Sequence, residues 1–268
     1  MSHIHIPDGV LPLWLWAAGW ILALALLFLA ARASSGPDAR RKVPLIGVIA
    51  ALMLVAMSWE IVPIAYHVNL SVIGGILLGP PLSVIAAFIV VVVLAMLGHG
   101  GVTVAGLNAI VLGVEMVLGW ALFRGAVGVL GRRHAALSTG LATVVTLALT
   151  TTMVVGLVWV AGATGGASGG ETGMLEPTSL QLPNPFSKGT QEPHSPADEH
   201  GHEHDVSSLS AARFAAVAYT LGPIGWLLEA LIGAAVIGYV ARVRPAMVFE
   251  GALAEKDPHI PSHESAGC

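Results

Sequence analysis

The chain has 268 residues, of which 55% are hydrophobic and only 10% are charged, and its net charge is −4. Soluble domains carry a charge on about a quarter of their residues, so this composition excludes an ordinary soluble protein. Several apolar stretches are about 20 residues long, which is the length of a helix that crosses a bilayer. The short alternating segments of a membrane barrel do not occur in the sequence. The composition therefore predicts an all-α, polytopic membrane protein.

Most of the predicted spans are uninterrupted, but Val68–Leu97 is broken by Gly79-Pro80-Pro81. Proline lacks the amide hydrogen that a helix interior needs, so this segment divides into Asn69–Gly79 and Leu82–Leu97. A helix of about eleven residues rises only about 16 Å, and the first piece must therefore be surrounded by protein rather than lipid. The other predicted spans, in chain order, are Leu11–Ala31, Val43–Tyr66, Val102–Phe123, Ala136–Ala161 and Ala211–Ala241.

Basic residues predict the orientation, because Lys and Arg accumulate in the short cytoplasmic loops of membrane proteins. They follow the first span, the Val102–Phe123 span and the last span, and they all fall on one side only if Val68–Leu97 crosses twice or dips in and returns. We therefore expect about seven helical segments, with the amino terminus outside and the carboxyl terminus inside. The ten residues are Arg32, Arg40, Arg41, Lys42, Arg124, Arg132, Arg133, Arg242, Arg244 and Lys256.

The chain is predicted to form a single transmembrane domain, residues 1–245, followed by a cytoplasmic tail, residues 246–268. Residues 163–206 form an extracellular loop that is rich in His, Asp, Glu, Gly, Pro and Ser. This loop has no hydrophobic periodicity, so we expect it to lack a fixed structure. It is either a weak collector of metal ions or a plain hydrophilic connection.

The first nine residues concentrate nitrogen donors beside the amino terminus. His3 and His5 lie in this segment, and the sequence Pro7-Asp8-Gly9 has the composition of a turn that could fold the segment back over the helices. Nickel, cobalt, copper and zinc all accept nitrogen ligands. Metal capture at a membrane face is therefore our first hypothesis, and a solvated tail with incidental histidines is the alternative.

His67 is predicted to close the second span, beside the polar residues Asn69 and Ser71. Ionisable residues at membrane depth usually face the bundle interior and mark a site, so we favour a metal ligand over a merely interfacial residue. Glu60 lies two turns earlier on the same predicted helix, and it is the best placed carboxylate to support His67. His99 lies in a glycine-rich turn, where it is either a further ligand or a solvated loop residue.

Two more groups within the predicted spans could support a cation site. Asn108 could orient a ligating histidine, although hydrogen bonding to another helix is its commoner role. Glu115 and Glu229, together with Glu60, are the carboxylates of the spans. Each of them needs a partner or a proton, because an uncompensated buried charge is costly. If they face a cavity, they favour a second hypothesis, a stand-alone secondary cation or proton-coupled transporter.

Motifs for hydrolysis do not occur in the sequence. The G-x-x-x-x-G-K-[ST] pattern that cradles nucleotide phosphates is missing, so the chain is not expected to bind ATP. The H-E-x-x-H and G-x-S-x-G patterns are missing as well. We therefore predict that the protein is not an enzyme, and no motif supports a third possibility, a membrane enzyme or assembly factor with a structural metal.

The sequence resembles the CbiM/NikM family, the nickel and cobalt substrate-specific membrane components of energy-coupling-factor (ECF) ABC transporters. The similar stretches run from residue 3 to about residue 245 and leave out the histidine-rich loop and the tail. They are specific together, although each alone is weak. They comprise His5-Ile6-Pro7-Asp8-Gly9, His67 placed twelve residues before Gly79, Leu97-Gly98-His99-Gly100-Gly101 with Gly106-Leu107-Asn108, Gly225-Trp226-Leu227-Leu228-Glu229, and Val243-Arg244-Pro245.

The resemblance implies seven helices with the amino terminus in the centre of the bundle. There the terminal amine, a backbone amide nitrogen, the adjacent histidine ring and a further histidine hold Ni2+ or Co2+ as the transported substrate. His67 matches the further histidine. In the family, the motif histidine is the second residue of the chain. If Met1 is removed here, Ser2 becomes the first residue and His3 becomes the second. If Met1 stays, His3 is third, and in both cases His5 could support or replace it.

The resemblance also implies partners. The family works with a transmembrane coupling protein and two ATP-binding-cassette ATPases, in agreement with the missing nucleotide motif, and it leaves room for a small accessory membrane subunit. The metal serves nickel enzymes or cobalamin biosynthesis. We expect a multi-pass protein in the cell (inner or plasma) membrane of a prokaryote, with the lipid bilayer and no nucleic acid among its partners. One departure concerns His99, which stands where many relatives carry an acidic residue.

Overall fold

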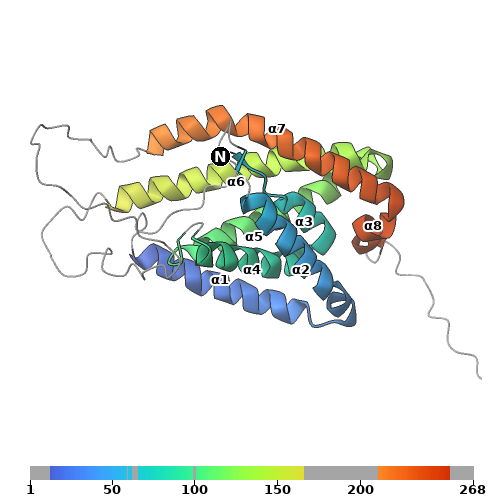
Figure 1. Ribbon diagram of the computed structural model, residues 1–268, viewed down its shortest axis with the longest axis horizontal. Coiled ribbons are helices and arrows are strands. Elements are labelled where there is room, and N and C mark those ends of the chain that lie inside the picture. Colours follow the sequence, from blue (N-terminus) through green and yellow to red (C-terminus); the bar gives the residue numbers. More distant parts are fainter. Residues whose placement is uncertain (1–12, 59, 62–65, 99–100, 166–210, 254–268) are drawn as a thin grey trace, which may run out of the picture.

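The computed structural model describes residues 13–58, 60–61, 66–98, 101–165 and 211–253. Within these residues the chain is helical, apart from one pair of two-residue strands (Figure 1). Four of the described helices are long and apolar enough to cross a membrane, and two shorter apolar helices, Lys42–Ser58 and Pro80–Met96, accompany them. The predicted class, an all-α polytopic membrane protein, is confirmed.

The first two helices are α1, Leu13–Ala33, and α2, Pro37–Ser58. The predicted span Val43–Tyr66 is wrong at its carboxyl end, because α2 stops at Ser58. After it, strand β1, Glu60–Ile61, pairs antiparallel with strand β2, Tyr66–His67. Hydropathy alone does not separate a helix from an apolar hairpin, and the apolar residues of this segment continue through both.

Two helices replace the interrupted segment: α3, Ser71–Leu78, and α4, Pro80–Met96. Gly79 joins them with φ of 79°, a conformation that glycine adopts without steric cost. The prediction that α4 begins at Leu82 is wrong by two residues, since proline is well tolerated in the first turn, where no intrahelical donor is needed. All eight residues of α3 are buried, so protein surrounds the short helix as the sequence predicted.

Helix α5, Ala105–Leu130, occupies the centre of the fold and contacts α1, α3, α4 and α6. Glycines allow two of these close approaches. A Cβ atom on Gly106 would lie 2.7 Å from the Cα atom of Trp20 in α1, and a Cβ atom on Gly75 of α3 would lie 2.0 Å from the carbonyl oxygen of Met116. The indole of Trp20 also donates a hydrogen bond of 2.8 Å to the carbonyl oxygen of Thr103. Small residues thus let the backbones pack closely, as in other membrane bundles.

A short 3-10 helix, η1, Arg132–His134, leads into α6, Ala135–Gly165, which runs antiparallel beside α7, Ala211–Val243 (Figure 1). The carboxyl ends of α1, α5 and α7 lie toward the same end of the bundle, on the right in Figure 1. There α8, Pro245–Leu253, packs against α7 and α3. The sequence did not predict α8, which occupies the first part of the predicted tail.

Candidate functional site

His67 lies at the end of the short hairpin that follows α2. In the antiparallel register, the Cα atom of His67 is the partner of the Cα atom of Glu60. The prediction that Glu60 supports His67 from the same helical face is therefore wrong in its geometry. The hairpin nevertheless places the two residues opposite each other on neighbouring strands. A buried polar cluster begins two residues after His67 in the chain.

Asn69 is the first residue of this cluster, and it is fully buried. Its backbone amide donates a hydrogen bond of 2.9 Å to Oε1 of Glu229 in α7. Its side-chain amide donates a second hydrogen bond, of 2.5 Å, to Oε1 of Glu115 in α5. A single loop residue therefore bridges two carboxylates that come from different helices.

Glu115 is the centre of the cluster, and it is also fully enclosed, with 1% of its surface exposed. In addition to Asn69, the hydroxyl of Ser71 at the start of α3 donates a hydrogen bond to its Oε1 atom. The hydroxyl of Thr150 in α6 donates to its Oε2 atom at 3.3 Å. A carboxylate offers about four acceptor positions, and these three donors from the loop, α3 and α6 satisfy most of them.

A carboxylate buried in a span needs a partner, and the structure supplies partners for Glu115 and Glu229. The partners are an amide, hydroxyls and a backbone N–H group rather than an arginine. Buried polar groups stabilise a membrane protein only when they are satisfied in this way. The cluster therefore fixes the start of α3 and the loop before it against α5, α6 and α7.

Of the predicted metal ligands, only His67 lies within the described residues. Ser2, His3, His5 and His99 lie outside the described residues, and their roles stay predictions. Asn108 is buried in α5, two turns before Glu115 and so on the same face of that helix. Among the described residues, no group of three or more His, Cys, Asp or Glu side chains could hold a metal ion by itself.

Thr150 is a member of the cluster that was not among the residues predicted from the sequence. A signal for it exists, because Thr139, Thr143, Thr146 and Thr150 follow one another at intervals of three or four residues along α6. This spacing places them on one face of the helix, and all four are buried. A polar stripe on an otherwise apolar span indicates a face that packs against protein rather than lipid.

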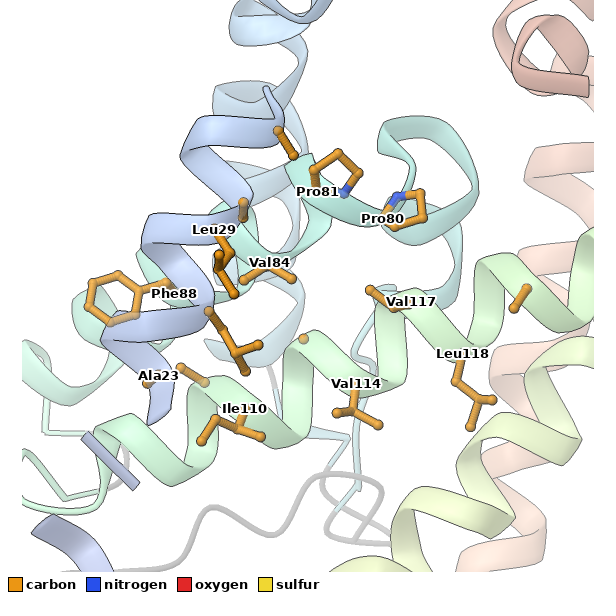
Figure 2. A pocket seen from close by; sticks show the side chains of 16 residues that line it. Ala23, Leu29, Pro80, Pro81, Val84, Phe88, Ile110, Val114, Val117 and Leu118 are labelled. Atoms are coloured by element: carbon orange, nitrogen blue, oxygen red, sulfur yellow. The ribbon is translucent and has the colours of Figure 1, made fainter. Parts of the chain in front are cut away.

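One pocket among the described residues is apolar and therefore unsuited to a cation. It is a cavity of about 650 Å³ between α1, α4 and α5, and Figure 2 shows apolar side chains such as Phe88, Ile110 and Val114 around it. Metal ions in proteins bind nitrogen, oxygen or sulfur donors, and the side chains that line this cavity offer none. The polar cluster near His67, and not this cavity, is the candidate site.

A bundle of apolar helices around a satisfied cluster of buried carboxylates defines a polytopic helical membrane protein with a polar centre. The chain belongs to the family described as the cobalt uptake substrate-specific transmembrane region, whose model matches residues 5–247. The resemblance to the CbiM/NikM family is thereby confirmed.

Individual relatives agree with this family. The chain is 36% identical to the cobalt transport protein CbiM of Geobacter sulfurreducens over 133 residues, which are 46% of this chain and 38% of that one. It is 35% identical over 126 residues to a Haloquadratum walsbyi protein assigned to metal transport, over 45% of this chain and 58% of that protein. These two matches span 38% and 58% of the relatives' own lengths. A protein assigned as CbiM in H. walsbyi is 29% identical over 90% of this chain and 94% of its own length.

A solved structure has the same fold. The crystal structure of a transition metal transporter superposes with a TM-score of 0.66 at 18% sequence identity, covering 93% of this chain and 99% of that one. At this identity the likeness establishes the arrangement of the helices and not the ligands of a site.

Proposed function

We propose that this chain is the substrate-binding membrane component of an ECF ABC transporter that takes up nickel or cobalt. The observation that carries the proposal is the match of the cobalt uptake family across residues 5–247, which includes His67 and the cluster around Glu115. The chain contains no nucleotide-binding motif, so ATP hydrolysis falls to partners. These are a transmembrane coupling protein and a pair of ATPases.

In this proposal the metal binds at the outer face and leaves toward the inner face when the partner complex reorients or opens the bundle. The ligands are nitrogen donors from the start of the chain together with His67. A set of this kind suits Ni2+, with Co2+ as the close competitor. Since the donors must be deprotonated to bind, capture is coupled to pH.

The proposed topology has seven helical segments, α1 to α7, with the amino terminus outside and the carboxyl terminus inside. Two observations support it. The carboxyl ends of α1, α5 and α7 lie toward one end of the bundle (Figure 1), and Arg32, Arg124 and Arg242 lie in or near those ends. Clustered basic residues are typical of the cytoplasmic side, so the hairpin with His67 belongs to the outer half.

Replacement of His67 tests the proposal directly. We expect the purified wild-type protein to bind one equivalent of Ni2+ or Co2+, and His67→Ala to bind at least about a hundredfold more weakly, because a lost ligand is worth more than a lost supporting contact. Titration calorimetry and elemental analysis of the metal content measure both. His134→Ala is the matched control: His134 is an exposed histidine of η1 whose Nδ1 atom contacts the carbonyl oxygen of Leu130.

If His67→Ala keeps the stoichiometry and affinity of the wild type, the proposal fails. Uptake into vesicles that contain only this chain and are energised by an ion gradient would also contradict it. That result would favour the stand-alone secondary transporter that Glu60, Glu115 and Glu229 suggested.

The histidines at the start of the chain can be ranked by the same binding measurement. We expect His3→Ala to abolish tight binding and His5→Ala to weaken it less, because His3 lies closer to the terminal amine with which it would form a chelate ring. The family match begins at His5, so the opposite ranking would assign the ligand to His5. Equal binding by both variants and the wild type would exclude each of the two histidines as an indispensable ligand.

A further inference from the structure

Asn69 joins the segment that carries His67 directly to two helices of the bundle, α5 and α7. Its backbone amide bonds Glu229 of α7 and its side-chain amide bonds Glu115 of α5. Glu115 in turn receives hydroxyl donors from Ser71 of α3 and Thr150 of α6. Asn69 is two residues from His67 in the sequence, so any shift of its backbone moves the histidine as well.

The backbone between Asn69 and α3 is held in an unfavourable conformation. Leu70 has φ of 57° and ψ of 13°, and it is the one described residue other than glycine with a positive φ. The left-handed region is disfavoured for leucine because its Cβ atom crowds the backbone. Residues in such conformations persist when the surrounding contacts determine them, and they cluster at functional sites. Here the residues on both sides of Leu70, Asn69 and Ser71, are bonded to the same carboxylate.

The backbone of His67 is therefore held from both directions along the chain. On its amino-terminal side, the antiparallel register pairs it with Glu60. On its carboxyl-terminal side, the bridge from Glu115 through Asn69 to Glu229 fixes the loop. Both carboxylates are buried, with 1% and 5% of their surfaces exposed, so water does not compete for these hydrogen bonds.

We propose that Asn69 is a positioning residue for the metal ligand His67, and that it acts through its hydrogen bonds to Glu115 and Glu229. The inference rests on the proposed function, because it assumes that His67 binds nickel or cobalt. An amide suits this role, since it donates to Glu115 and carries no charge of its own between two carboxylates. The bridge also connects the metal site to α5 and α7, so that metal binding and the packing of these helices influence each other.

The decisive comparison is between Asn69→Ala and Thr150→Ala, measured as Ni2+ and Co2+ binding by the purified full-length chain. Each variant removes one donor to Glu115, so both are expected to lower the thermal stability to a similar extent. We expect only Asn69→Ala to weaken metal binding, by about ten- to a hundredfold, as is usual when a group that orients a ligand is lost. At saturating Co2+, its visible absorption bands should also shift, because the histidine no longer approaches the metal in the same way.

A second pair of variants tests the inference if Asn69→Ala does not fold. Glu229→Gln keeps a carbonyl oxygen that accepts the hydrogen bond from the Asn69 backbone, whereas Glu229→Leu does not. We expect the glutamine variant to bind metal within a few-fold of the wild type, and the leucine variant to bind it at least tenfold more weakly. Equal losses in the two variants would mean that the charge of Glu229 matters rather than its hydrogen bond, and would overturn the inference.

The outcomes separate this inference from the proposed function. If wild type and His67→Ala bind metal equally, or neither binds it, the proposed function fails and the positioning role fails with it. If His67→Ala loses binding while Asn69→Ala binds as tightly as Thr150→Ala, only the positioning role fails. Weaker binding by Asn69→Ala together with unchanged binding by Thr150→Ala supports both.

Discussion

Gly75→Ala is expected to be strongly destabilising. A Cβ atom at this position would lie 2.0 Å from the carbonyl oxygen of Met116 and 2.8 Å from its carbonyl carbon. Both are backbone atoms of α5, and they cannot move aside as a flexible side chain does. Overpacking of a core usually costs about 1–3 kcal/mol, and we expect a cost at or above the upper end here. Size-exclusion chromatography in detergent and a thermal unfolding curve measure the loss.

Gly156→Ala in α6 is the matched control for this prediction. Gly156 is exposed, and a Cβ atom there would meet nothing within 4 Å. We expect this variant to elute and unfold like the wild type, since alanine suits a helix at least as well as glycine. If Gly75→Ala behaves in the same way as Gly156→Ala, α3 and α5 do not approach each other as closely as the structure shows.

The substitution Gly75→Ala is also expected to disturb the candidate site, because it would displace α3. This helix has eight residues, all of them buried, and it begins at Ser71, whose hydroxyl bonds Glu115. A displacement of α3 away from α5 would therefore pull Ser71 and Asn69 away from the carboxylate. We expect Gly75→Ala to lose metal binding together with its fold, in contrast to His67→Ala, which should lose metal binding alone.

Much of the fold could be predicted from the sequence, because long apolar stretches must form helices in a membrane. The spans of α1, α5, α6 and α7 follow from this rule, and so does the short buried α3, from the Gly79-Pro80-Pro81 interruption. The carboxyl end of α2 could not be predicted in this way. Apart from Glu60, the residues between Ser58 and His67 are apolar, and hydropathy does not separate a strand from a helix.

The candidate site was only partly predictable for a related reason. Glu115 and Glu229 lie within predicted spans, and a buried charge is costly, so the sequence predicted that each of them has a partner. The identity of the partners was not, because Asn69 is 46 residues from Glu115 and 160 residues from Glu229. Nothing local couples residues at these separations, and only the packing of α3, α5 and α7 brings them together. His67 stood out because it is an ionisable residue at the end of a predicted span, near the polar residues Asn69 and Ser71.

Glu115→Leu is expected to destabilise the fold by an amount comparable to the effect of Gly75→Ala. The change leaves the side-chain amide of Asn69 and the hydroxyl of Ser71 buried without their acceptor. The hydroxyl of Thr150 is less affected, since it also contacts the carbonyl oxygen of Thr146 at 3.0 Å. Each unsatisfied buried group costs about 1–3 kcal/mol, so two of them should lower the unfolding free energy by roughly 2–6 kcal/mol. Thermal unfolding in detergent measures the loss.

The double variant Glu115→Leu/Ser71→Ala decides whether this loss comes from unsatisfied donors or from packing. Removal of both partners of a buried hydrogen bond is much less costly than removal of one, so the double variant should be more stable than Glu115→Leu alone. If packing around residue 115 were the cause, the second substitution would lower the stability further. Because Asn69 still lacks its acceptor in the double variant, we expect its stability to recover only in part, and its metal affinity to remain as low as that of Asn69→Ala.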